Sequence, residues 1–378
     1  MPCPAACILS HLLHAIIMCC LMARTPLYEQ LAAAGADFAE YCGAETARSF
    51  GDSRAEYHAI VSAAGIYDLG WRAKIVLTGS DRVRWTNGMV TNNVRDLAQD
   101  HGNYNFILNP QGRIQGDLYV YNFGDHLLVE TELWQAARLK DIFDKFIIMD
   151  DVEVADISDK LTAIAVQGPQ ALSILRSIGI TIADDVEPLV VARSVWQDVG
   201  ISMTRMASDI AKTFEIWLAP ENAPKLWNAV RAAGAKPVGT DALEIFRVAA
   251  GVPRYGQDIR ERDLPQETGQ SQALHFTKGC YVGQEIVERI HSRGNVHRQF
   301  TGFVISGPQP EPGAKIEADG KEVGEITSSK QLPTESGTEI VALGYVRKEA
   351  AEPGKRVQVS GSPAAVVRPP FKEALTPV

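Results

Sequence analysis

Residues 104–121 read YNFILNPQGRIQGDLYVY, two apolar runs on either side of the turn-forming residues NPQG. This pattern predicts a strand, a tight turn and a second strand. The run HLLVETE at 126–132 predicts a third strand, and residues 131–146 carry apolar side chains at the three- and four-residue spacing of a helix. Strands that follow one another without a helix between them favour antiparallel pairing. The sequence therefore predicts an α+β fold.

The pattern changes after about residue 298. Short β-rich runs at 299–306, 314–329, 339–346 and 355–369 are separated by Pro, Gly and an Asp-Gly turn, which predicts a small all-β domain, a barrel. Nearer the N-terminus, Ser53 with Glu56 three residues later predicts a helix that begins with a capping box. We expect three segments: an extension at 1–21, an α+β region at 22–297 and the barrel at 298–378.

The composition is that of an ordinary globular protein, with 46% hydrophobic and 22% charged residues in a chain of 378. The formal charge of −9 and the pI near 5.5 argue against a nucleic-acid-binding surface, because phosphate binding depends on clustered Lys and Arg. A compact anion remains a possible local ligand. We expect no nucleic-acid partner.

Four of the six cysteines lie within the first 20 residues, and only Cys42 and Cys280 follow. That distribution does not fit a disulfide framework and predicts a cytoplasmic protein. The apolar run at 8–22 has no basic residue before Arg24 and is too short to span a bilayer, so we expect no stable membrane insertion. A translation start at Met22 explains this run best, and weak targeting is the alternative.

Several common catalytic motifs are absent from the sequence, including GxGxxG after a strand, GxxxxGK[ST], GxSxG, HExxH and CxxC. His275, His291 and His297 lie near Cys280 in the chain. Their spacing matches no standard zinc pattern, so they are better interpreted as surface or hydrogen-bonded histidines. We expect no metal site.

Residues 278–285 read KGCYVGQE, and the following EIVERIH predicts a helix entered at Gly283. Cys280 would then lie near the positive end of the helix dipole and two residues from Lys278, and both features favour a thiolate. A buried structural cysteine needs neither feature. Gly279 allows backbone conformations closed to other residues, so the backbone of this loop is suited to lie close to another group.

KGCYVGQE, with LPQETG before it, resembles the signature of the YgfZ family, folate-binding relatives of the glycine-cleavage T-protein implicated in maintaining iron–sulfur enzymes. The wider resemblance to T-proteins covers the chain from Met22 onward. It rests on these stretches: TPLYEQ (25–30), SAAGIYDLG (62–70), LTGSDR (77–82), IAVQGPQA (164–171), RVAAGVPRYGQDI (247–259), GEITSS (324–329) and VALGYV (341–346). The resemblance implies a cloverleaf of two interleaved α+β subdomains and a C-terminal barrel around a channel that holds tetrahydrofolate or a one-carbon-substituted folate.

T-proteins carry a pattern similar to LNxxGGxxDD, and the resemblance places the catalytic acid at the first Asp of the pair. The matching stretch here is LNPQGRIQGDL, so that position is Gly116 and Asp117 matches the second Asp. Adjacent side chains on a strand point to opposite faces, so Asp117 replaces the missing acid only through a register shift or a bulge. Loss of a general acid or base costs roughly 100- to 10,000-fold in rate. We therefore expect no ordinary T-protein activity, with Asp117 as the remaining catalytic candidate at this site.

The resemblance also implies folate-binding residues. Tyr104, Asn109 and Arg247 match the tyrosine, the LN asparagine and the RxxxG arginine of T-proteins. The T-protein GYTGE stretch, whose glutamate the resemblance assigns to the pterin, has no clear counterpart here. Asp209 takes the place of that glutamate if the loop is shifted. Glu215 is expected on the next strand. Without the resemblance, the three matched residues are interpreted as a core aromatic, a turn former and a helix-surface cation.

The motif divides into two parts. Tyr281, Gly283, Gln284 and Glu285 match the FIGRE stretch of T-proteins and indicate shared scaffold, whereas Lys278, Gly279 and Cys280 distinguish the YgfZ branch. The first hypothesis is a tetrahydrofolate-binding accessory protein for iron–sulfur client enzymes or assembly factors, acting through Cys280. The second is a tetrahydrofolate-dependent aminomethyl- or methyltransferase of T-protein type. A third is a protein-interaction module that binds no folate.

Overall fold

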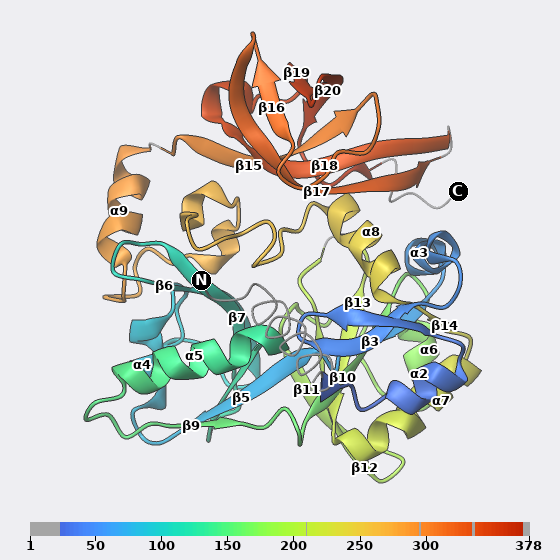
Figure 1. Cartoon of the computed structure of the whole chain (residues 1–378). Helices are drawn as coiled ribbons and strands as arrows, with labels where there is room; N and C mark the ends of the chain where they lie inside the picture. Colours follow the sequence, from blue (N-terminus) through green and yellow to red (C-terminus); the bar gives the residue numbers. More distant parts are fainter. Residues whose placement is uncertain (1–22, 209, 295, 335–336, 373–378) are drawn as a thin grey trace, which may run out of the picture.

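A computed structural model describes residues 23–208, 210–294, 296–334 and 337–372 of the protein (Figure 1). The predicted extension at 1–21 and Asp209 lie outside these residues. Within them, no helix is long and apolar enough to cross a membrane. The molecule consists of two α+β parts with a barrel above them in Figure 1. The prediction of an α+β fold with a C-terminal barrel is confirmed.

The first α+β part is built on a six-stranded sheet of order β11-β12-β13-β10-β4-β14. Its strands are β4 (Gly65–Asp68), β10 (Thr162–Gln167), β11 (Val191–Trp196), β12 (Val199–Arg205), β13 (Thr213–Leu218) and β14 (Lys236–Pro237). Helices α6 (Ala171–Ser177) and α7 (Ala223–Ala232) cover one face, where Ile164 and Ile216 pack against Leu175 and Trp227. Helices α3 (Ser53–Ser62) and α8 (Thr240–Ala250) pack on the other face. Both faces are therefore apolar, as buried strands require.

A small sheet of order β1-β3-β2 lies at the start of the described chain, with β1 (Ala23–Arg24), helix α2 (Tyr28–Ala33), β2 (Asp37–Tyr41) and β3 (Ala44–Ser49). The turn between β2 and β3 contacts the second α+β part, where the backbone N–H of Trp134 donates to the carbonyl of Cys42.

The second α+β part is an antiparallel sheet of order β6-β7-β8-β5-β9. Its strands are β5 (Arg72–Thr78), β6 (His101–Leu108), β7 (Ile114–Asn122), β8 (Leu127–Glu132) and β9 (Glu153–Asp156). Helices α4 (Arg82–Met89) and α5 (Leu133–Phe146) cover one face. The chain leaves the first sheet after β4, builds this sheet and returns to the first at β10, so the two parts are interleaved.

The barrel is closed, with strand order β15-β18-β17-β16-β19-β20. Its strands are β15 (Arg298–Ile305), β16 (Lys315–Ala318), β17 (Lys321–Thr334), β18 (Gly337–Arg347), β19 (Arg356–Val359) and β20 (Ser362–Val367). Phe303, Ile326 and Val346 fill the interior. Leu343 and Tyr345 face outward and share a core with helix α8, which lies between the barrel and the first sheet (Figure 1).

Two helix starts test the sequence patterns. The predicted capping box at Ser53 is wrong: Asp52 is the N-cap residue and accepts from the backbone N–H groups of Arg54 and Ala55. Glu56 instead accepts from the N–H groups of Phe50 and Gly239, so it joins α3 to the loop before α8. The predicted helix after Gly283 is confirmed as α9 (Gln284–Arg293).

The face of the second sheet that points away from α4 and α5 carries a buried ion pair. Lys74 on β5 and Glu130 on β8 are directly opposite in the ladder, and Lys74 Nζ lies 2.7 Å from Glu130 Oε1. Both side chains are fully buried. Removing Lys74 would leave the buried Glu130 with only its longer contact to Arg72 at 3.5 Å, and breaking a buried ion pair costs about 3–5 kcal/mol.

We therefore expect Lys74→Met to lower the free energy of unfolding by about 3 kcal/mol, and Lys74→Met/Glu130→Leu to restore only part of that loss, because Arg72 then loses its contact with Glu130. Urea denaturation of both variants measures this. The matched control is Lys315→Met, which removes an exposed partner of Glu322 and should leave the stability nearly unchanged. Equal losses in the buried and the exposed variant would contradict this interpretation.

Candidate functional site

A cavity of about 370 Å³ lies against the charged face of the second sheet, which we call the inner chamber. Its sheet side is formed by Trp71, Arg72, Tyr104, Asp117, Tyr119 and Glu132. Residues 252–255, with Tyr41 and Arg247, form the opposite side. The volume is in the range of small-molecule and cofactor sites.

The carboxylate of Asp117 is held from two sides in this chamber. The hydroxyl of Tyr104 donates to Oδ2 at 2.8 Å, and Nε2 of Gln135 donates to Oδ1 at 2.8 Å. Burial raises the pKa of Tyr104 well above its ordinary value, and the nearby charge of Asp117 adds to this. The Tyr104 hydroxyl therefore keeps its proton and remains a hydrogen-bond donor. The two contacts together fix the orientation of the Asp117 carboxylate.

Gly116 does not face the chamber. A β-carbon at this position would lie 2.8 Å from Cδ2 of Leu139 and 3.2 Å from Oε1 of Gln135, both on helix α5. The β6–β7 ladder pairs Ile107 with Gly116 and the next residue with Ile114, so the register shifts at the bulge between them. Asp117 therefore faces the chamber, with a bulge beside it in the ladder, and its role as the replacement for the missing acid stays a prediction.

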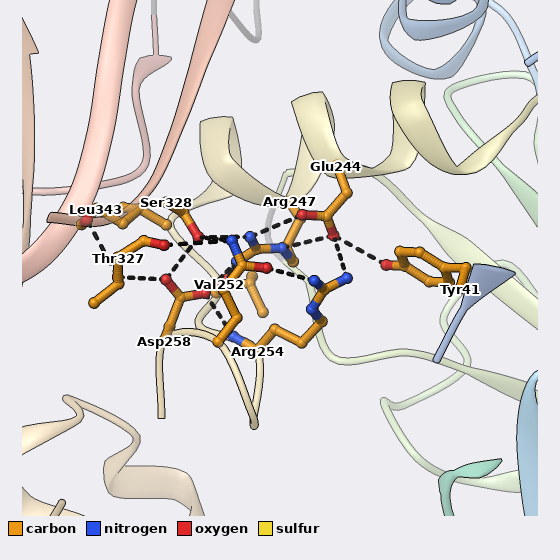
Figure 2. Close-up of polar contacts among 10 residues, drawn as sticks. Tyr41, Glu244, Arg247, Val252, Arg254, Asp258, Thr327, Ser328 and Leu343 are labelled. Atoms are coloured by element: carbon orange, nitrogen blue, oxygen red, sulfur yellow. Dashed lines mark hydrogen bonds and ion pairs between the residues drawn. The ribbon is translucent and has the colours of Figure 1, made fainter. Parts of the chain in front are cut away.

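Arg247 lines the chamber, but its guanidinium group is fully engaged in protein contacts (Figure 2). It forms a two-point contact with Glu244 at 2.9 Å and contacts Asp258 Oδ2 at 2.6 Å and Ser328 Oγ at 2.9 Å. Burial alone would raise the pKa of Glu244, but Arg247 and Arg254 outweigh it and lower that pKa to about 2. Arg247 thus joins α8 to the barrel at the edge of the chamber.

The other matched folate residues occupy different places. Oδ1 of Asn109 accepts from the backbone N–H groups of Gln111 and Arg113, which closes the turn between β6 and β7, and Asn109 is not part of the chamber wall. Glu215 lies on β13, as expected, and is buried behind the chamber. Asp209 lies outside the described residues.

The KGCYVGQE segment reaches the chamber only through Lys278. Its Nζ donates to the carbonyls of Val90 and Asn92 at 2.6 Å, and Asn92 lines the chamber. Burial, with a smaller contribution from Arg95, lowers the pKa of Lys278 to about 7. Cys280 is exposed and is not part of the chamber wall.

The rest of the segment makes local contacts. Tyr281 is buried with Lys278 Nζ 5.0 Å from its ring centre, and its backbone N–H donates to Gln284. Glu285 forms an exposed ion pair with Arg289. Gly283 has φ of 82°, and a β-carbon there would lie 2.6 Å from the carbonyl oxygen of Asn109. This glycine is therefore required by the close approach of the two turns.

The histidines near Cys280 make no metal site in the described part of the chain, where no group of three or more His, Cys, Asp or Glu side chains is arranged to hold a metal ion. The ring of His291 stacks on Phe276, with a centroid distance of 3.8 Å.

Sequence reasoning missed Glu132, Arg254, Gln135 and the aromatic residues Tyr41, Trp71 and Tyr255. The signal for Glu132 was present: in LLVETE, two glutamates alternate with apolar or small residues at the period of a strand. Glu130 and Glu132 lie on one face of this strand, and the sequence pattern alone did not indicate that this face is buried.

The chamber suits a planar ligand with polar groups at its edge. Trp71, Tyr104 and Tyr119 provide aromatic surface. Nε of Arg72, a lining residue, is buried and has no hydrogen-bond partner among the described residues. Buried polar atoms are normally paired, so this N–H group is suited to contact a bound ligand.

Comparisons with known proteins identify the family of the chain. The model of the GCVT N-terminal domain matches residues 27–278, and that of the glycine cleavage T-protein C-terminal barrel domain matches 298–372. An aminomethyltransferase of Nostoc sp. is 29% identical, covering 93% of this chain and 96% of the relative. One from Rubrobacter xylanophilus is 30% identical, covering 92% and 94%.

A solved structure shares the fold. The glycine cleavage system aminomethyltransferase T from Bartonella henselae superposes with a TM-score of 0.84 at 22% identity, covering 93% of this chain and 99% of that one. The reported relatives are named aminomethyltransferases, so the YgfZ assignment stays a prediction.

Glu215 provides a test of the buried charges behind the chamber. Burial, and then the charge of Glu130, raises its pKa from 4.5 to about 7. A carboxyl group with a raised pKa in the folded state contributes stability that is complete below its unfolded pKa and is lost as the pH rises through the folded one.

We therefore expect the free energy of unfolding of the wild type to fall relative to Glu215→Gln between about pH 4.5 and pH 7, by up to ~1.4 kcal/mol per pH unit. Denaturant titrations at pH 5, 6, 7 and 8 measure the difference. Glu153→Gln, an exposed substitution on β9, is the control and should show no such change. A difference that is constant with pH would refute the assigned titration.

Proposed function

The chain belongs to the glycine cleavage T-protein family, and from this membership we propose that it is a tetrahydrofolate-dependent transferase of aminomethyl or methyl groups. The observation that carries the proposal is the carboxylate of Asp117, which is fixed by Tyr104 and Gln135 in an aromatic chamber. The relatives' name, aminomethyltransferase, supports the same class of reaction.

The residues of the chamber have separable roles in this proposal. Tetrahydrofolate supplies the reduced nitrogen atoms that accept a one-carbon unit. Trp71 and Tyr119 would bound the flat ring, and the unpaired Nε–H of Arg72 would contact its polar edge. Asp117 would accept or return a proton, since it is the carboxylate whose two oxygen atoms are both oriented by side chains.

Asp117→Asn tests the proposal. We expect the rate of methylene-tetrahydrofolate formation from an aminomethylated lipoyl carrier to fall roughly 100- to 10,000-fold, because general acid–base catalysis contributes that much. Folate affinity, followed by tryptophan fluorescence during titration with reduced folate, should change far less. Asp125→Asn, in the exposed turn between β7 and β8, is the control.

Two results would contradict the proposal. Unchanged turnover in Asp117→Asn would remove this residue from catalysis. Absence of saturable folate binding by the wild type would favour a protein-interaction module instead.

An accessory role for iron–sulfur enzymes is the alternative, and the exposed thiol of Cys280 is the observation that favours it. Lys278, two residues earlier, donates to the carbonyl of Asn92 in the chamber wall, which links the segment that carries the thiol to the chamber. Under this alternative, the partners would be iron–sulfur client enzymes or assembly factors.

The two functions are separated by comparing Cys280→Ala with Asp117→Asn in the native host, where the gene itself is first shown to be required. A loss of cluster-dependent enzyme activities in Cys280→Ala alone would support the accessory role. Undiminished activities in Cys280→Ala, with a defect in Asp117→Asn, would support the transferase.

A further inference from the structure

A second cavity, of about 670 Å³, lies on the outer surface of the barrel, and we call it the barrel groove. Strands β15, β17 and β18 supply one side of it, with Arg298, Gly324 and Tyr345 among the lining residues. The loop at 262–267 and the turn between β6 and β7 supply the rest. Among the described residues, no residue lines both the groove and the inner chamber. The groove is therefore a separate site.

The groove carries a local excess of positive charge. The charged side chains that line it in the described part of the chain, taken with their ion-pair partners, are six cations and four carboxylates. The cations are Arg113, Arg260, Arg262, Arg298, Lys315 and Arg347, and the carboxylates are Asp263, Glu267, Glu322 and Glu325. The whole chain has a formal charge of −9, so this excess is a property of the groove. A groove lined by one sign of charge attracts ligands of the opposite sign.

Each of the four carboxylates already contacts a cation. The contacts are those of Asp263 and Glu267 with Arg298, of Glu325 with Arg260 and Arg262, and of Glu322 with Lys315. Arg113 and Arg347 form no ion pair with any described residue. The excess charge therefore belongs to these two arginines.

Arg347 has a neighbour of the same charge. The β15–β18 ladder places Arg347 directly across from Arg298. Like charges opposite each other on a sheet are unfavourable. Arg298 is compensated by Asp263 at 2.5 Å and Glu267 at 3.1 Å, whereas Arg347 is not compensated by a described residue. An anion in the groove would supply the counter-charge of Arg347.

Arg113 approaches the groove from the turn between β6 and β7. Its Nη1 donates to the backbone carbonyl of Arg262 in the opposing loop. This contact restricts the side chain and leaves its other N–H groups for a ligand. A guanidinium group presents several N–H donors in one plane, which matches the geometry of phosphate and carboxylate groups.

The hydroxyl of Tyr345 is a further unpaired donor. Tyr345 lines the groove and is 1% exposed, and its hydroxyl has no hydrogen-bond partner among the described residues. Burial, and then the charge of Asp263, raises the pKa of Tyr345, so the hydroxyl keeps its proton. Buried polar groups are normally paired. This hydroxyl is therefore suited to donate to a ligand in the groove.

We propose that the barrel groove binds a compact multivalent oxyanion, the phosphate or carboxylate groups of a small molecule. Arg113 and Arg347 pair with the anion, and the hydroxyl of Tyr345 donates to it. The volume of the groove is in the range of small-molecule sites, so it has room for more than a single phosphate group. The proposal does not depend on the transferase assignment, because the groove and the chamber are lined by different residues.

Isothermal titration calorimetry of the full chain at pH 7.5 and constant ionic strength tests the proposal, with sodium pyrophosphate and sodium citrate as the two probes. We expect saturable binding of at least one, and the tighter probe identifies phosphate or carboxylate as the preferred group. Arg347→Gln and Arg113→Gln should each weaken binding roughly tenfold, because each removes a charge-assisted contact. Tyr345→Phe should weaken it by a smaller factor. Arg356→Gln is the control and should leave binding unchanged, because Arg356 is an exposed cation of β19 outside the groove.

Three results would overturn the proposal. The first is the absence of saturable binding of both probes by the wild type. The second is wild-type affinity in both Arg347→Gln and Arg113→Gln. The third is an equal loss in Arg356→Gln, which would indicate attraction to the surface charge of the barrel in general. Denaturation curves check that each variant is folded, and Arg113→Gln gives a second measurement if Arg347→Gln is not.

Discussion

The buried guanidinium group of Arg247 is the contact on which the arrangement of the parts depends. A buried charge is costly unless each donor finds a partner, and the partners here come from α8, the loop at 252–258 and strand β17 (Figure 2). The barrel is thereby fixed relative to the helix that forms the chamber's edge. A lysine would supply the charge without the planar, multi-point geometry, so it would not hold the three segments in the same way.

The chamber itself follows from the alternation of side chains along the second sheet. Leu118 and Val120 face helices α4 and α5, so Asp117 and Tyr119 must face the opposite side. The helices supply an apolar cover for one face, and the polar face is buried only because the other parts of the molecule close over it. The burial of charged side chains on this face is thus a consequence of the interleaved architecture and not of the sheet alone.

The strands, the barrel and the helix after Gly283 were predictable, because each depends on a local pattern. The site was predictable only in part. Tyr104 and Asp117 were named, but matching a motif by position could not tell that Asp117 faces the chamber and that Gly116 faces helix α5. Glu132 was missed because a charged residue in a strand usually marks a solvent face, and its burial depends on contacts distant in sequence.

The KGC segment shows how far a motif can be explained by folding alone. Lys278 is buried against two carbonyls, and Gly279 has φ of 96°, so both residues are required by the shape of the loop. That loop connects the chamber-lining residues Gln270 and Gln272 to helix α9. The identity of these two residues therefore carries no separate indication of iron–sulfur chemistry. Only the exposed thiol of Cys280 has no explanation in the packing of the loop. Asp117 and Glu132, in contrast, line the chamber. The residues of the site therefore favour the transferase over the accessory role.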